Sequence, residues 1–309
     1  MLQTIGNPAS VKGLYQYQDV IGLLSASGAG FSGPVSVEFG PDGNLYVLHR
    51  CFEGSCVDRD ESPILVFEPS GEFVRGWGEG LFIRPHGFHI DPEGNVWATD
   101  DRAHVVFKFS AHGELLMTLG RHGVSGDGPN VFDQPTDVLV APNGNLFVAN
   151  GHGMGANRVI NLAGNGTFIK AWGSTGTGEG EFDIPHALAM DSQGRLFVGD
   201  RNNARIQIFD QNGEYIDQWT QFGRPSGLFI TPDDTLYVAD NQSFGVLNPG
   251  VKKGIRVGSA QDGALRYLIE DLEATSLEEA GAEGVGVDVE GNVYGAVVRR
   301  MMLEKHERL

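Results

Sequence analysis

Basic residues are scarce in this sequence. The 309 residues include 22 lysines and arginines against 40 aspartates and glutamates, which leaves a formal net charge of −18. A chain this acidic, without a cluster of lysine and arginine, lacks the basic face that contacts with nucleic-acid phosphates or an anionic membrane require. We therefore expect neither nucleic acid nor a membrane among its partners.

Long apolar runs are missing as well. No stretch approaches the roughly 18 apolar residues that a membrane-spanning helix needs. The first residues also lack the basic segment followed by an apolar segment that marks a signal peptide. The location therefore stays open: the sequence as given favours the cytoplasm, and a leader removed beforehand would place the protein outside it.

Cysteine is limited to Cys51 and Cys56, which lie in one short loop. This spacing is compatible with a small disulfide-closed loop and equally with two free thiols. A zinc knuckle would need a second pair of cysteines or histidines. Glycine, by contrast, is abundant at 45 residues, which indicates many tight turns between short strands.

One short phrase recurs six times and indicates the fold. Each copy reads as a tight turn between two alternating apolar runs, and a second turn with two further runs follows. The turn positions lie 40 to 57 residues apart, at Gly43, Gly94, Gly144, Gly194, Asp234 and Gly291. Four antiparallel strands per repeat predict an all-β, six-bladed β-propeller over residues 1–309, as one domain.

The last repeat, residues 282–309, is one strand short. Residues from about 13 to 24 resemble the fourth strand of the other repeats. We therefore expect the N-terminal strand to complete the last blade and to close the ring, which also removes two exposed sheet edges. The sequence leaves the choice between a monomer and a small homo-oligomer open.

A ring of side chains is predicted around the channel. Nine residues before each turn lies a proline or its counterpart, and the next residue opens the innermost strand. These ring residues are, in blade order, Val35, His86, Thr136, His186, Ser226 and Glu283. Alternate blades lie about 120° apart, so His86, His186 and Glu283 converge at one level. Two imidazoles and a carboxylate with open positions predict a divalent metal site, with Zn²⁺ favoured and Fe²⁺ as the alternative.

Charged and titratable side chains surround the same mouth, because the second strand of each blade ends there. Arg50 and Arg201 suit an anionic group of a small substrate, or pair with nearby aspartates instead. His152 suits proton transfer, or is an exposed loop histidine. A structural Ca²⁺ is also considered.

Four segments carry a resemblance to a known family. Arg84-Pro-His-Gly-Phe-His-Ile-Asp, Gln134-Pro-Thr-Asp-Val, Ile184-Pro-His-Ala-Leu-Ala-Met and Gly199-Asp-Arg-Asn-Asn-Ala-Arg-Ile-Gln-Ile-Phe resemble the NHL-repeat propeller of peptidyl-α-hydroxyglycine α-amidating lyase. The resemblance covers residues 34 to 295, approximately. The copper monooxygenase domain that accompanies the animal enzyme has no counterpart in these residues.

The resemblance implies functional roles for individual residues. In that family three channel histidines bind zinc; the first two resemble His86 and His186, and the third falls on Glu283 here. A family arginine that contacts the acid end of the substrate aligns with Arg50. A family tyrosine that acts as base falls in the loop that begins at His152, which has no tyrosine and is two residues longer.

The sequence thus favours a metal-dependent lyase, similar to the amidating lyases, that acts on a small hydroxylated substrate in the channel. A metal-dependent hydrolase or an Fe²⁺ oxygenase with the same His86, His186 and Glu283 site is the first alternative. The second is a non-catalytic NHL module that binds a ligand or a protein on the mouth face. In that case Glu283→Ala would leave function intact, and changes in the loop 51–62 would abolish it.

Overall fold

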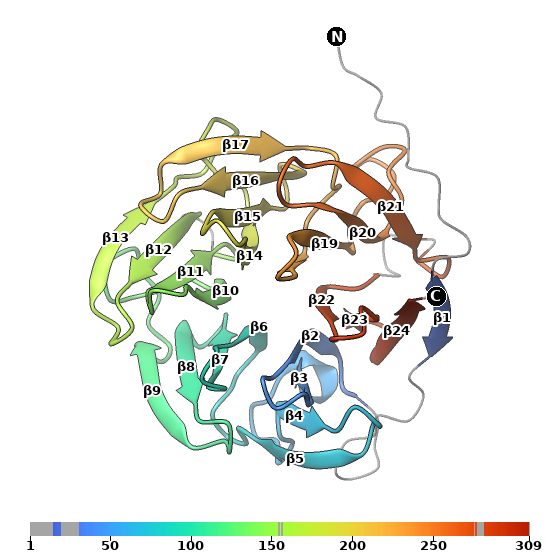
Figure 1. The fold of residues 1–309 in the computed structure, drawn as a ribbon. Coiled ribbons are helices and arrows are strands. Elements are labelled where there is room, and N and C mark those ends of the chain that lie inside the picture. The colour runs from blue at the N-terminus through green and yellow to red at the C-terminus, as the bar shows by residue number, and fades with distance from the viewer. Residues whose placement is uncertain are drawn as a thin grey trace.

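The structure of the chain is a computed structural model that describes residues 15–19, 31–153, 155, 157–274, 276 and 281–308. Its strands form six four-stranded antiparallel sheets, which stand as blades around a central axis (Figure 1). The predicted all-β six-bladed propeller is confirmed. The short 3-10 helix η1 (Phe52–Gly54) is the one helical element of the described residues, and none of their helices is long and apolar enough to cross a membrane.

The first three blades follow one another along the chain. Blade 1 consists of β2 (Pro34–Phe39), β3 (Leu45–His49), β4 (Ile64–Phe67) and β5 (Phe73–Trp77). Blade 2 consists of β6 (Pro85–Ile90), β7 (Val96–Asp100), β8 (Val105–Phe109) and β9 (Leu115–Gly120). Blade 3 consists of β10 (Pro135–Val140), β11 (Leu146–Asn150), β12 (Arg158–Leu162) and β13 (Phe168–Trp172). The first strand of each blade is innermost (Figure 1).

The remaining blades keep this order, and the last one borrows a strand. Blade 4 consists of β14 (Pro185–Met190), β15 (Leu196–Asp200), β16 (Arg205–Phe209) and β17 (Tyr215–Trp219). Blade 5 consists of β18 (Gly227–Ile230), β19 (Thr235–Asp240), β20 (Gly254–Ser259) and β21 (Leu265–Glu270). Blade 6 consists of β22 (Gly284–Val287), β23 (Val293–Val297), β24 (Met302–Arg308) and β1 (Tyr15–Asp19).

The two ends of the chain close the ring. Strand β1 pairs antiparallel with β24, in a register that runs from Tyr15 opposite Arg308 to Asp19 opposite Glu304. The prediction that the N-terminal strand completes the last blade is confirmed. The rest of the predicted range, residues 13–14 and 20–24, lies outside the described residues. Closure gives β24 a partner on both sides, so its backbone groups are paired within the ring.

The repeated turns have the conformation that their residues favour. Gly43 has φ +79°, a left-handed conformation that glycine adopts without a steric penalty. The side chain of Asp42 accepts a hydrogen bond from the backbone N–H of Asn44 at 3.1 Å, which closes the turn. In blade 5 the glycine is replaced by Asp234, which still adopts φ +61°. Aspartate tolerates this region better than most residues, so the fifth copy of the turn forms without glycine.

Tryptophans at the ends of outer strands join neighbouring blades. The ring of Trp77 in blade 1 lies against Gly113 in blade 2, where a Cβ atom on the glycine would come within 2.7 Å of the indole. Corresponding contacts join Trp172 to Gly213 and Trp219 to Gly263. The tryptophans therefore pack between blades, and glycine is required at each contact because no side chain fits there.

Candidate functional site

The innermost strands surround a cavity of about 260 Å³ on the propeller axis. All six predicted ring residues line it: Val35, His86, Thr136, His186, Ser226 and Glu283. The ring is therefore formed as the repeat spacing predicts. What it can do depends on how its polar atoms are partnered.

The two ring histidines are held in the same way. Nδ1 of His86 lies 2.7 Å from the backbone carbonyl oxygen of Thr136, the ring residue of the next blade. Nδ1 of His186 lies 2.6 Å from the carbonyl oxygen of Ser226, again the ring residue of the next blade. A carbonyl oxygen only accepts, so each Nδ1 carries the proton and donates it. In a neutral imidazole with its proton on Nδ1, the lone pair is on Nε2, as a metal-binding histidine requires.

Both Nε2 atoms are buried and have no hydrogen-bond partner among the described residues. The Oε1 atom of Glu283 faces them, 3.3 Å from Nε2 of His86 and 3.7 Å from Nε2 of His186. Ligand atoms about 3.3 Å apart are expected around a tetrahedral ion with bonds of about 2.0 Å. A nitrogen lone pair and a carboxylate oxygen repel each other unless a proton or a metal ion lies between them. The spacing of these atoms fits a divalent metal ion in that position.

Glu283 is held in its charged form by its neighbours. Burial acts to raise the pKa of this carboxyl, but Arg50, His86 and His186 outweigh it and hold the pKa well below its ordinary value. The NH2 atom of Arg50 lies 3.3 Å from Oε1. Arg50 therefore contacts the candidate metal ligand Glu283 directly, a contact that spans 233 positions along the chain.

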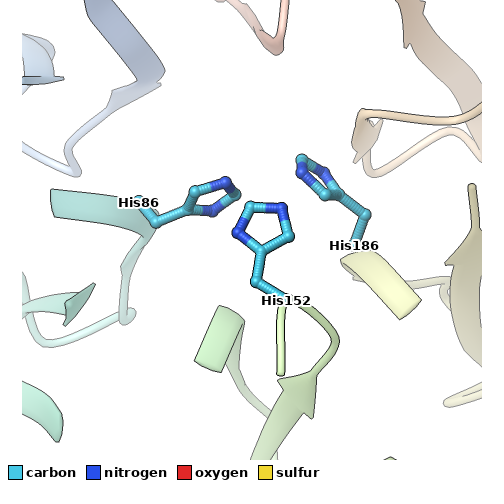
Figure 2. Close-up of side chains that lie close together, drawn as sticks. All are labelled: His86, His152 and His186. Carbon is cyan, nitrogen blue, oxygen red and sulfur yellow. The ribbon is translucent and has the colours of Figure 1, made fainter. Parts of the chain in front are cut away.

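His152 lies in the same group, on the loop after β11. Figure 2 shows its ring between those of His86 and His186, with ring centroids 4.5 Å and 5.1 Å away. The ligand atoms of the three histidines all lie within 4.8 Å of one another, so this group could hold a metal ion. Burial, followed by the effect of His86, lowers the pKa of His152 to about 3. His152 is therefore neutral near pH 7, and one of its ring nitrogens has a lone pair for a metal or a proton.

A repeated backbone contact places the mouth residues. In blades 1 to 4, a residue just after the second strand donates its backbone N–H to a carbonyl oxygen. That carbonyl belongs to the residue before the proline that precedes the ring residue. The pairs are Arg50 to Gly33, Asp101 to Arg84, His152 to Gln134 and Arg201 to Ile184, at 2.9 to 3.3 Å. Ile184 accepts this contact at φ +59°, which is unusual for a β-branched residue and costs about 1–3 kcal/mol. The mouth side chains are thus tied to the strands that carry the ring.

Two arginines at the mouth keep unsatisfied donors. The Nε atoms of Arg50 and Arg201 are buried without a hydrogen-bond partner among the described residues. Arg201 is 7% exposed, and it forms no ion pair with any residue that the structure describes. Burial, then Arg224 and Arg50, lower the pKa of Arg201 to about 10, while Glu283 acts in the opposite direction. A buried guanidinium with free N–H donors can bind an anion, which supplies the hydrogen-bond acceptors.

Cys51 and Cys56 form a disulfide, with Cα atoms 4.8 Å apart, which decides between the two states that their spacing allowed. Both cysteines are buried. The backbone N–H of Cys56 donates to the carbonyl of Ile83 at 2.9 Å. The disulfide loop therefore begins directly after Arg50 and packs against the segment that leads into Pro85 and His86.

The sequence analysis assigned no role to Asp101, the residue that contacts Nδ1 of His152. Nδ1 of His152 lies 2.8 Å from Oδ2 of Asp101, which is fully buried. The sequence does place Asp101 at the channel mouth, after the second strand of blade 2, but gives no sign that its carboxylate reaches a loop 51 residues away. The roles of Arg50, His152 and Arg201, and metal binding by His86, His186 and Glu283, stay predictions.

Comparison with known proteins agrees with this architecture. The sequence profile of the NHL repeat matches residues 182–209. Peptidyl-alpha-hydroxyglycine alpha-amidating lyase 1 of Drosophila melanogaster is 32% identical over 96% of this chain and 60% of its own length. Peptidyl-glycine alpha-amidating monooxygenase B of Xenopus laevis is 37% identical over 66% of this chain and 26% of its own length. The chain is a six-bladed propeller with an NHL repeat at residues 182–209, and it resembles the amidating lyases. It spans about a quarter of the frog protein.

Solved structures show the same fold in other enzymes. A gluconolactonase from Xanthomonas campestris matches with a TM-score of 0.66 at 14% identity, covering 96% of this chain and 90% of its own. Virginiamycin B lyase from Staphylococcus aureus matches with a TM-score of 0.59 at 12% identity, covering 96% and 100%. These likenesses concern the fold alone.

Proposed function

We propose that this NHL propeller is a metal-dependent lyase, similar to the amidating lyases, that acts on a small hydroxylated substrate at the mouth of the channel. The observation that carries the proposal is the pair of buried Nε2 atoms of His86 and His186. Both lack a hydrogen-bond partner and face the carboxylate of Glu283. We assign these three residues as the metal ligands. A bound Zn²⁺ would supply a Lewis acid that polarises a substrate oxygen and lowers the pKa of a hydroxyl group.

The substrate would carry an anionic group beside the reacting carbon. Arg201 is the stronger candidate to bind it, because it lacks an ion pair among the described residues, whereas Arg50 already contacts Glu283. Both arginines keep a buried Nε donor free. A carboxylate held by these two donors would fix one end of the substrate and leave its hydroxyl directed toward the ring histidines.

His152 would accept the proton of the substrate hydroxyl. Its Nε2 atom lies 3.4 Å from the NH2 atom of Arg201, so a substrate bound to Arg201 lies beside this nitrogen. For an α-hydroxyglycine derivative, transfer of the hydroxyl proton to Nε2 allows the carbonyl to form while the carbon–nitrogen bond breaks. The electron pair of that bond leaves with the amide nitrogen, which takes up a proton. The products are a primary amide and glyoxylate, whose carboxylate stays with the arginines.

The test combines metal analysis with activity on one substrate. We expect the purified protein to contain close to one equivalent of metal at the channel site, located by anomalous scattering, and to release glyoxylate from N-benzoyl-α-hydroxyglycine. His86→Ala combined with His186→Ala should abolish both, and His112→Ala, an exposed turn histidine, should change neither. Folded wild-type protein that binds no metal and releases no glyoxylate would rule the proposal out.

The same donor set favours one alternative chemistry. Two histidines and one carboxylate with open positions are typical of non-haem Fe²⁺ oxygenases as well as of hydrolytic zinc enzymes. Oxygen consumption that depends on Fe²⁺ and a reductant would indicate the oxygenase. Glyoxylate release that persists with Zn²⁺ under anaerobic conditions would indicate the lyase.

A further inference from the structure

The carboxylate of Asp101 is the best-held acid at the mouth. It is fully buried, and its Oδ1 atom accepts a hydrogen bond from Nε of Arg84 at 2.7 Å. Its Oδ2 atom contacts the NH2 atom of the same arginine and also Nδ1 of His152, at 2.8 Å. The three residues come from separate segments: the turn before β6, the end of β7 and the loop after β11.

These contacts decide which nitrogen of His152 carries its proton. The hydrogen bonds from Arg84 hold the carboxylate of Asp101 in place. Burial acts to raise the pKa of Asp101, but the hydrogen bonds from His152 and Arg84 outweigh it and lower the pKa. An ionised carboxylate only accepts hydrogen bonds, so Nδ1 of His152 must donate. The lone pair is then on Nε2, where the NH2 atom of Arg201 lies 3.4 Å away as a donor.

We propose that Asp101, with Arg84 behind it, is the positioning residue that makes His152 a proton acceptor. The inference rests on the proposed function, in which Nε2 of His152 takes the substrate proton. Among the described residues the side-chain hydrogen-bond partners of the Asp101 carboxylate are Arg84 and His152, and none of the three assigned metal ligands. It fixes the orientation and the tautomer of the imidazole, as the aspartate does for the histidine in acid–histidine–nucleophile systems.

The alternative is that Asp101 only joins the three segments, which would make its effect purely structural. Asp101→Asn separates the two, because it keeps the shape of the side chain and can donate to Nδ1. The proton of His152 would then move to Nε2. In the metal-loaded protein we expect kcat to fall about 10²- to 10⁴-fold. KM should stay within about threefold and metal content should be unchanged, because the arginines and the ring residues are intact.

The decisive readout is independent of activity. Nitrogen-15 NMR of histidine-labelled protein, with His152 assigned from His152→Gln, should show the proton on Nδ1 in the wild type and on Nε2 in Asp101→Asn. Glu38→Gln is the matched control, since Glu38 is also a carboxylate beside a histidine, with Oε1 3.3 Å from Nδ1 of His89. It should leave the His152 signals and kcat unchanged.

Three results would overturn the inference. One is a wild-type His152 with its proton on Nε2, which can be measured even if Asp101→Asn fails to fold. Another is an unchanged tautomer or an unchanged kcat in Asp101→Asn. The last is loss of metal from Asp101→Asn, which would make His152 a ligand and not a proton acceptor. If the wild type lacks lyase activity altogether, the proposed function fails, while the tautomer measurement still decides whether Asp101 positions His152.

Discussion

Arg201 and Arg205 lie four residues apart in blade 4, and both are almost completely buried, at 7% and 6% exposure. Arg205 is part of an internal brace: its Nε atom lies 2.7 Å from Asp200, and its other nitrogens donate to Gln218 and to backbone carbonyls of the preceding loop. Arg201 is at the channel mouth, where its contact with His152 at 3.4 Å is the one hydrogen bond described for its side chain.

The two arginines differ in how their hydrogen-bond donors are satisfied and not in how deeply they are buried. Burial is the same for both arginines, so burial alone carries no information about function. The brace satisfies its charge inside the protein, and blade 5 repeats it with Arg256 and Asp240, 2.9 Å apart. The mouth leaves donors unsatisfied, which is costly in the free protein and becomes favourable only when a ligand supplies acceptors.

The largest expected difference between the two arginines appears when each charge is removed in turn. Arg205→Met should lower the free energy of unfolding by about 3–5 kcal/mol, because it leaves Asp200 buried and uncompensated. Arg201→Met should change it by less than about 1 kcal/mol, or raise it, since it removes an unpaired buried cation. Urea denaturation of the two variants measures both. Equal losses would mean that Arg201 is a brace as well.

Removal of a ring histidine tests whether that histidine is a metal ligand. A structural zinc site with four ligands contributes about 10–16 kcal/mol, so the loss of one ligand costs roughly 3 kcal/mol, or about a hundredfold in affinity. We expect His86→Ala to weaken Zn²⁺ binding by that factor in competition with a chromogenic chelator. His89→Ala, three residues along β6, is the control and should bind Zn²⁺ normally. A normal affinity in His86→Ala would contradict the ligand assignment.

Acid should destabilise the metal-free protein through the mouth histidines. Burial lowers the pKa of His152 to about 3, against about 6.5 in the unfolded chain. Below pH 6.5 His152 is therefore protonated in the unfolded state but not in the folded state, so the free energy of unfolding decreases as pH falls. Between pH 7.5 and pH 5 this contributes about 2 kcal/mol, since each pKa unit is worth about 1.4 kcal/mol.

His152→Gln isolates that contribution. Chemical denaturation in EDTA at the two pH values should show a smaller loss for the variant than for the wild type, by about 2 kcal/mol. Carboxylates stay ionised in most of this range, so they contribute little to the difference. Parallel pH dependences in the two proteins would show that His152 is as accessible to protons as a surface histidine.

The smallest expected effect is that of Glu283→Gln, which leaves Arg50 without its ion-pair partner. Glu283→Gln removes the carboxylate that lies 3.3 Å from Arg50 and leaves a neutral oxygen as the third metal donor. We expect Zn²⁺ affinity to fall by about tenfold, roughly 1.4 kcal/mol, and glyoxylate binding to become tighter by a few-fold. Isothermal titration of each ligand measures these changes. Weaker glyoxylate binding would show that Arg50 does not bind the anion.

The sequence carried the fold almost completely. Six copies of one turn phrase specified six blades, and the unpaired run near the N-terminus specified how the ring closes. Repeats are predictable in this way because each copy solves the same local problem, and a side chain in a fixed frame has the same neighbours in every blade.

The site was predicted less completely, because its contacts join different repeats. The frame placed His86, His186 and Glu283 around the axis, but it could not show that Nδ1 of each histidine bonds a carbonyl of the next blade. The disulfide between Cys51 and Cys56 was one of two states that the spacing allowed. Asp101 received no role, since its partner lies on a loop of a different blade.

The repeat pattern is therefore enough to place each residue along a strand and around the ring. Which atoms of those residues are left without partners depends on the folded structure. Strand register follows from local alternation and turns, but a free lone pair depends on rotamers and on acceptors that folding brings from 40 or 50 residues away. The chemistry at the mouth depends on those unpartnered atoms, so it becomes visible only once the ring is closed.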